Sequence, residues 1–167
     1  MSVFRAFIFA ILCLWTSAAF AAAPADPAAL ISSIYANGSE EEVWSQWLNA
    51  RKRAKWFSRR IVALWAKGDA IARKAQSEGP LDFDVATNSQ GATIKDFKVR
   101  VADQTAARAT VIATLVPDNW ERRSQRENEI RYDLVLEEGH WAIDDIHSVA
   151  EPKPWSLSKL LTHFLRH

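Results

Sequence analysis

The sequence predicts an α+β fold, in which N-terminal helices pack on a curved antiparallel sheet and a further helix follows at the C-terminus. Up to Gly79 and Pro80, apolar residues recur every three or four positions, which is the period of an amphipathic helix. Beyond these two residues the period changes to two, as in strands with one buried face. Because helical and strand segments are separated along the chain, the strands are expected to pair antiparallel, with the helices packed on the sheet.

Three helices are expected before the sheet. The first covers residues 28–36, where apolar side chains form a single stripe. A capping box is expected to open the second helix, with Ser39 accepting from the Glu42 amide while Glu42 reaches back. The third and longest helix is expected over residues 58–76, and Gly68 interrupts its pattern at a point where the helix could kink.

Four strands are expected in the second half of the chain. Their ranges are 96–101, 108–116, 129–136 and 140–147. Glu138-Gly139 supplies the turn of an antiparallel hairpin between the last two strands. The prolines at 152 and 154 break any continuation, and Ser156 is expected to cap the terminal helix.

The first 21 residues are typical of a secretory signal peptide. Arg5 precedes an apolar run over residues 6–20, and the small residues around Phe20 predict cleavage after Ala21. An uncleaved membrane anchor is the alternative, although the run is shorter than a bilayer-spanning helix requires. Residues 22–27 are expected to form a linker and 28–167 a single α+β domain, located in the periplasm or secreted.

The composition restricts the possible functions of the exported domain. Cleavage would remove the only cysteine, Cys13, and with it any thiol chemistry. Of 21 Lys and Arg residues only Arg5 would be lost, which leaves 20 against 20 Asp and Glu. This balance argues against nucleic-acid binding, which usually requires a basic domain. Trp15 would also be lost from the eight tryptophans, and most of the remaining seven are expected in the core.

Several segments resemble one family of secreted bacterial proteins, which is classed as a domain of unknown function. The similarity rests on Tyr35, on residues 57–58, 81–84 with Gln90, 132–135, 139–146 and 155–161. The resemblance implies the cystatin-like cone of the nuclear-transport-factor-2 superfamily and an exported location. It implies no particular reaction, since one fold serves many functions.

A basic segment, residues 51–60, is the first candidate for a functional site. It contains six cations and no acid, together with Trp56 and Phe57. Clustered charge beside aromatic rings predicts contact with an anionic lipid surface or an acidic protein face. The predicted contact residues are Arg51, Arg53, Lys55, Trp56 and Arg59. The alternative is a solvated junction between two helices.

Three further candidates are weaker. Trp120 lies on a polar loop, either tucked against the sheet or exposed as a contact residue. Asp145 and His147 share one face of a strand and could form an acid–base pair, or have a structural role only. Asp82 and Asp84 could bind a cation, but capping of turns is favoured, and no metal or other cofactor is expected.

These observations predict an exported, non-enzymatic binding or accessory protein of the periplasm. It would contact an envelope protein or a small apolar ligand through the concave sheet face or the basic segment. One alternative is a small lyase or isomerase that uses Asp145 and His147 within the cone. Another is an immunity-type inhibitor of an envelope protein. No nucleophile elbow, phosphate loop or metal-binding histidine pair is found in the sequence.

Overall fold

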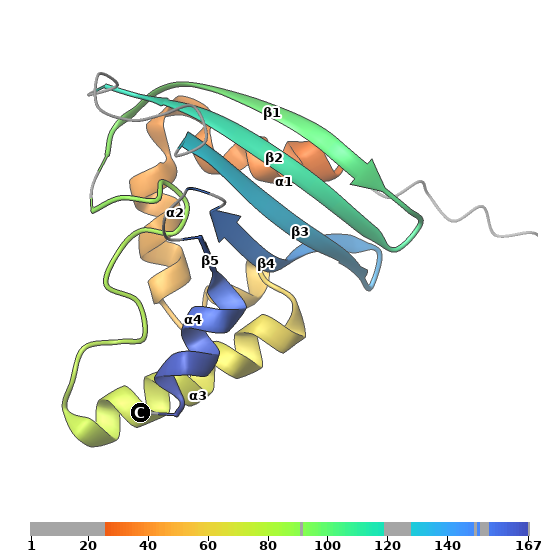
Figure 1. Ribbon diagram of the computed structural model, residues 1–167. Coiled ribbons are helices and arrows are strands. Elements are labelled where there is room, and N and C mark those ends of the chain that lie inside the picture. Colours follow the sequence, from red (N-terminus) through yellow and green to blue (C-terminus); the bar gives the residue numbers. More distant parts are fainter. Residues whose placement is uncertain (1–25, 91, 119–127, 149, 151–153, 167) are drawn as a thin grey trace, which may run out of the picture.

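The computed structural model describes residues 26–90, 92–118, 128–148, 150 and 154–166 (Figure 1). They form helices and one five-stranded antiparallel sheet, with a helix at the C-terminal end, so the predicted α+β class is confirmed. The predicted signal peptide, residues 1–21, and the candidate contact residue Trp120 lie outside the described residues. Within the described ranges, every helix is too short or too polar to cross a bilayer.

The helical half contains three α-helices and two single-turn 3-10 helices. In chain order they are α1 (Pro27–Tyr35), η1 (Ala36–Gly38), α2 (Glu40–Leu48), η2 (Arg53–Lys55) and α3 (Arg59–Ala75). Asp26 caps α1 by accepting from the amide of Ala28 at 2.9 Å, and Ser58 caps α3 by accepting from the amide of Ile61 at 3.3 Å.

The prediction of a capping box at Ser39 is wrong. Its hydroxyl donates to the carbonyl of Ile34 at 2.9 Å and to that of Ser33 at 3.1 Å, so it satisfies the end of α1 instead of the start of α2. Asn37 and Gly38 both have positive φ, which folds the chain back tightly over those carbonyls.

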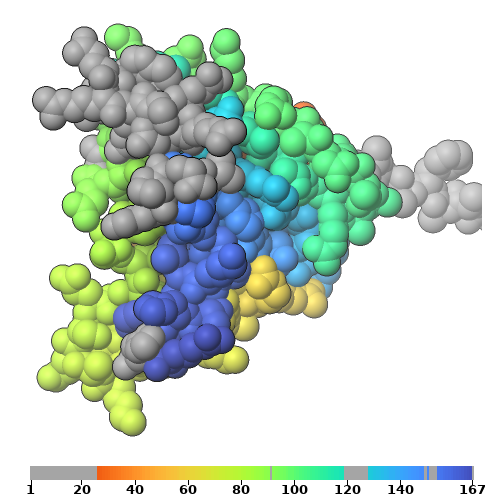
Figure 2. Space-filling view, viewed as in Figure 1, coloured from red at the N-terminus to blue at the C-terminus, as the bar shows by residue number. Residues whose placement is uncertain are grey.

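Gly68 permits a close approach between elements. Helix α3 continues through it without a break, and a Cβ at this position would lie 3.1 Å from Cγ of Pro80 and 3.6 Å from the Phe164 ring. Phe164 belongs to α4 (Leu157–Phe164), which packs on α3 and on the last long strand. In the space-filling view the blue surface of α4 meets the yellow surface of α3 (Figure 2).

The sheet has the strand order β1-β2-β3-β4-β5. The strands are β1 (Ile94–Gln104), β2 (Arg108–Pro117), β3 (Glu129–Glu137), β4 (His140–Ser148) and the short β5 (Trp155–Ser156). Helix α1 crosses behind β1 and β2, whereas α3 and α4 lie toward the β4 side (Figure 1). The pairing of β3 with β4 shifts its register between Asp133 and Leu134, which leaves Asp144 without a partner residue on β3. Asp144 therefore forms a bulge in β4.

The core lies between the helices and alternate side chains of β2, β3 and β4. Trp141 and Ile143 of β4 are buried. Trp47, Trp56 and Trp65 are buried as well, and Phe57 packs edge-on against Trp47 with ring centroids 4.9 Å apart. The remaining fully buried apolar strand residues are Val111, Ala113, Leu115, Ile130, Tyr132, Leu134 and Ile146.

A buried hydrogen-bond chain joins α1, the sheet and the loop before β1. Tyr132 and Tyr35 share a hydrogen bond of 2.5 Å between their hydroxyls, and Tyr35 donates to the carbonyl of Ala86 at 2.7 Å. Burial raises the pKa of both phenols, so both stay neutral. The loop is therefore held against the core by a fully neutral pair of hydroxyls.

Candidate binding cleft beside the basic segment

The basic segment is divided between the interior and the surface. Arg53 is only 1% exposed. Its Nε donates to the carbonyl of Trp47 at 2.6 Å, and its two terminal nitrogens donate to the carbonyl of Leu48 at 3.1 Å and to Oδ2 of Asp69 at 2.8 Å. The guanidinium also lies 4.2 Å from the ring centroid of Trp65. Arg53 therefore joins the C-terminus of α2 to the middle of α3.

The prediction that Arg53 and Trp56 are exposed contact residues is wrong. The single turn of η2 points the Arg53 side chain back at the last carbonyls of α2, which need donors. Trp56 is buried as well, and its Nε1 donates to Oε1 of Gln46 at 3.1 Å. Lys55 covers the ring of Trp56, with its Nζ 5.1 Å from the ring centroid.

The other predicted cations are on the surface. Arg51, Lys55 and Arg59 are exposed, and Arg59 forms an ion pair with Glu138 in which both side chains are more than 70% exposed. Arg60 contacts the bulged Asp144, with Nε 3.0 Å from Oδ1. Burial disfavours ionisation of Asp144, but hydrogen bonds from Arg60 and Ser58 outweigh it and lower the pKa of the carboxyl.

The segment that links η2 to α3 is attached to the sheet by backbone hydrogen bonds. The amide of Ser58 donates to the carbonyl of Ile143 at 2.9 Å, and the amide of Ile143 donates to the carbonyl of Trp56 at 2.8 Å. Phe57 thereby forms a parallel bridge with Ile143 and covers the free edge of the first half of β4. This attachment fixes the basic segment next to the β3–β4 hairpin.

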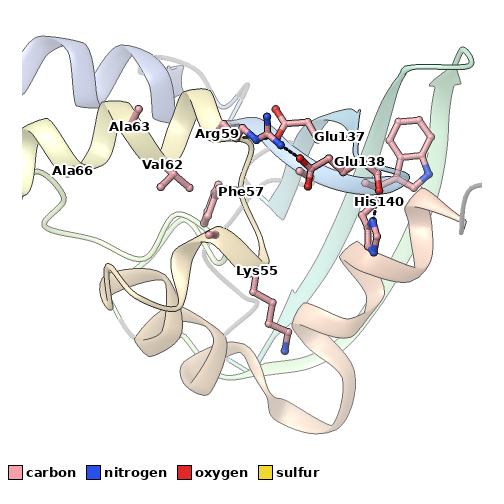
Figure 3. Close-up of a pocket in the computed structure, with 12 residues that line it drawn as sticks. Lys55, Phe57, Arg59, Val62, Ala63, Ala66, Glu137, Glu138 and His140 are labelled. Atoms are coloured by element: carbon pink, nitrogen blue, oxygen red, sulfur yellow. Dashed lines mark hydrogen bonds and ion pairs between the residues drawn. The ribbon is translucent and has the colours of Figure 1, made fainter.

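A cleft of about 670 Å³ opens between the basic segment and this hairpin, and we call it the junction cleft. Its lining residues are Ala54, Lys55, Phe57, Arg59, Val62, Ala63, Ala66, Glu137, Glu138, His140, Trp141 and Ala142. In Figure 3 Phe57, Val62 and Ala63 lie on the helical side, and Arg59 reaches across to Glu138 on the hairpin. Lys55 extends away from that ion pair (Figure 3).

The junction cleft combines an apolar interior with charged groups at its margin. Two of the predicted contact residues, Lys55 and Arg59, line it. Sequence reasoning missed Glu137, Glu138 and His140, although Glu138 is part of the predicted hairpin turn and the other two flank it. Glu137 accepts from the amide of Arg59 at 3.2 Å and so interacts with the N-terminus of α3.

The second predicted site, the Asp145–His147 pair, has a different arrangement from the one expected. Nε2 of His147 is 2.8 Å from Oδ2 of Asp133 but 3.8 Å from Oδ2 of Asp145, so the hydrogen-bonded partner is Asp133. Asp145 instead accepts from the amide of Ser158 at 3.0 Å and from its hydroxyl at 2.5 Å. It therefore stabilises the first turn of α4.

Asp133 is the centre of this network. Partial burial opposes its ionisation, but hydrogen bonds from His147, Arg131 and Thr110 lower its pKa to about 2. The network is fully explained by strand-to-strand and strand-to-helix contacts, and none of its members lines the junction cleft.

In the Asp82 and Asp84 pair, Asp84 has a structural role in the loop before β1. Asp84 accepts from the amide of Ala86 at 2.7 Å and from the hydroxyl of Thr87 at 2.9 Å, which is the turn-capping role favoured from the sequence. Within the described ranges, no three His, Cys, Asp or Glu side chains are grouped closely enough to bind an ion.

Comparison of the chain with family models, with curated proteins and with solved structures finds no match in any of the three. The function therefore has to be argued from the geometry of the clefts.

Proposed function

We propose that this chain is an exported, non-enzymatic binding protein, and that its junction cleft holds a small, mainly apolar ligand with one anionic group. The observation that carries the proposal is the lining of the cleft. Phe57, Val62 and Ala142 offer an apolar surface, and Lys55 stands at the margin. A volume of about 670 Å³ is in the range of pockets that enclose small organic ligands.

Lys55 is the cation best placed to bind the anionic group. Among the described residues it forms no ion pair, whereas Arg59 is paired with Glu138. The Arg59–Glu138 pair is solvent-exposed on both sides and contributes little to stability. An anionic ligand can therefore engage Arg59 as well, at a small cost in lost ion pairing.

The location and the finer description of the fold belong to the same proposal. Arg5, the apolar run that follows it and the small residues before Ala22 support export to the periplasm or secretion. The sheet with N-terminal helices on one face supports the cone of the nuclear-transport-factor-2 superfamily.

Filling the cleft tests the proposal directly. Ala63 is exposed on α3 and lines the cleft, so Ala63→Trp should occupy it without disturbing the core. Ala70 is exposed on the same helix but is not among the cleft residues, which makes Ala70→Trp the matched control. With decanoate as the probe, calorimetry should show at least tenfold weaker binding to the Ala63→Trp protein and no change for Ala70→Trp.

The charge requirement is tested separately. Lys55→Ala should weaken decanoate binding about fivefold, because an exposed cation contributes on the order of 1 kcal/mol. Lys52→Ala, which removes an exposed cation outside the cleft, should leave it unchanged. Equal binding by wild type, Ala63→Trp and Lys55→Ala would refute the assignment of the cleft.

A further inference from the structure

A second cleft opens beside α2, and all the charged residues that line it are acidic. It has a volume of about 690 Å³ and lies between α2 and the loop that precedes β1. Trp44 and Leu48 line it from the helix, and Leu81 and Phe83 line it from the loop. We call it the acidic cleft, and it shares no lining residue with the junction cleft.

Four carboxylates line the acidic cleft: Glu40, Glu41, Asp82 and Asp84. No lysine, arginine or histidine is among its lining residues in the described part of the chain. Carboxylates that face one cavity without a cation repel each other, and the local field attracts positive charge. By itself such a cluster is common at protein surfaces, and a specific binding site requires a further feature.

Glu40 supplies that feature. The residue is only 6% exposed, and its Oε1 accepts one hydrogen bond of 3.3 Å from the amide of Ile94. Its Oε2 is buried and has no hydrogen-bond partner among the described residues. A buried carboxylate oxygen without a donor is costly, because the water lost on folding has not been replaced. No cationic side chain lines the cleft, so Oε2 of Glu40 is left without a charge-balancing donor among the described residues.

The neighbouring Asp84 differs from Glu40, because the protein already satisfies its carboxylate. Both of its oxygens are occupied, by the amide of Ala86 and by the hydroxyl of Thr87. It therefore adds negative potential to the cleft without offering a free acceptor. Burial raises the pKa of its carboxyl, and the charge of Glu40 acts in the same direction, which is consistent with two carboxylates close together.

The rest of the cleft wall is apolar and aromatic. Leu48 is 50% exposed, although it is a large hydrophobic residue, and Trp44, Leu81 and Phe83 are half-buried. Apolar surface left open beside a negative group is suited to a ligand with an apolar body. The ring of Trp44 adds a face on which a cation is attracted.

We propose that the acidic cleft binds a small organic cation, consisting of a primary ammonium or guanidinium group on an apolar body. The charged group donates to Glu40, and the apolar body lies against Trp44, Leu48 and Phe83. The same chemistry is presented by a free amine and by a lysine side chain of another protein, and the test distinguishes these two sources.

The first measurement uses the full chain as it is, with no substitution. Hexylammonium and hexan-1-ol have the same apolar body and differ in charge, so their dissociation constants isolate the contribution of the carboxylates. Calorimetry should give at least tenfold tighter binding of hexylammonium, and the difference should shrink as salt is raised. Equal binding of the two compounds would overturn the proposal.

The second measurement locates the charge. Glu40→Gln keeps an acceptor for the amide of Ile94 and removes only the negative charge, so binding of hexylammonium should weaken at least tenfold. Glu41→Gln is the matched control, since Glu41 also lines the cleft but is exposed, and it should weaken binding less than threefold. Equal weakening by the two substitutions would show that the cleft is a general negative surface without a specific site.

Two further measurements test whether Glu40→Gln still folds normally and identify the source of the ligand. The urea midpoint of Glu40→Gln should not fall, because the substitution removes a buried charge that no cation balances and keeps an acceptor for the amide of Ile94. A large fall would assign Glu40 to the structure and overturn its role in binding. Tighter binding of hexylammonium than of N-acetyl-lysine methylamide supports a free amine as the ligand, and the reverse order supports a lysine side chain of a partner protein.

Discussion

Replacing the buried Arg53 with alanine is the most informative perturbation of the fold. This side chain makes three hydrogen bonds within the protein and lies over the ring of Trp65. The carbonyl of Trp47 is buried and would lose its donor, which costs about 1–3 kcal/mol. Asp69 is 26% exposed, so water would solvate its carboxylate, and the lost ion pair would add about 1 kcal/mol.

The total expected loss for Arg53→Ala is about 2–4 kcal/mol, from the unsatisfied carbonyl and the lost ion pair together. Arg53→Lys should lose roughly half as much, because an ammonium keeps the charge but cannot reach both carbonyls and Asp69 together. Arg51→Ala is the control, since Arg51 is exposed, and its effect should stay within about 0.5 kcal/mol.

Urea unfolding followed by tryptophan fluorescence and by circular dichroism measures all three variants. Coincident transitions by the two probes would justify a two-state treatment. If Arg53→Ala unfolds within about 1 kcal/mol of wild type, Arg53 does not hold α2 to α3. The basic segment would then be solvated throughout, which is the alternative that the sequence also allows.

Three other substitutions test the packing and the network on the sheet. Trp141→Ala should cost about 3–5 kcal/mol in urea melts, because it leaves a large cavity in the core. Asp133 has a pKa of about 2, below its ordinary value of 3.8, so it stabilises the fold above about pH 4 and loses this effect as the pH falls toward 2. Since a third of its side chain is exposed, Asp133→Asn should remove only about 1–2 kcal/mol at pH 7, and should flatten the acid limb of the stability profile. Gly68→Ala should destabilise by about 1 kcal/mol, because the new methyl would crowd Pro80, and a gain in stability would contradict the close approach.

Most of the regular structure could be predicted from periodicity. The helix expected over residues 58–76 is α3 (Arg59–Ala75), and the strands expected at 108–116 and 140–147 agree with β2 and β4 to within one residue at each end. These segments bury one face each, so their apolar pattern is strong. The exposed end of β1 at Gln104 has no such pattern, because its pairing with β2 comes from backbone hydrogen bonds alone.

The candidate sites could be predicted only in part, because their members come together through tertiary contacts. Nothing in a run of six cations distinguishes Arg53 from its neighbours. Its burial depends on where α2 ends and on Asp69, which lies one helix further along the chain. The same limit applies to Glu40, which looks like an ordinary first-turn carboxylate until the loop before β1 closes over it.

The near-balance of charge in the whole chain conceals a separation that the fold creates. Arg53 is neutralised inside the structure by Asp69, and the exposed Arg60 is paired with Asp144, so that these two cations of the basic segment are already balanced by acids of the same fold. Lys55 remains as an unpaired cation beside an apolar cleft, and Glu40 remains as an unpaired carboxylate in another. A net charge of +1 excludes partners that need a uniformly charged surface, but it does not exclude ligands that meet one uncompensated charge inside a cleft. Binding at either cleft should therefore depend on single side chains more than on the overall charge of the protein.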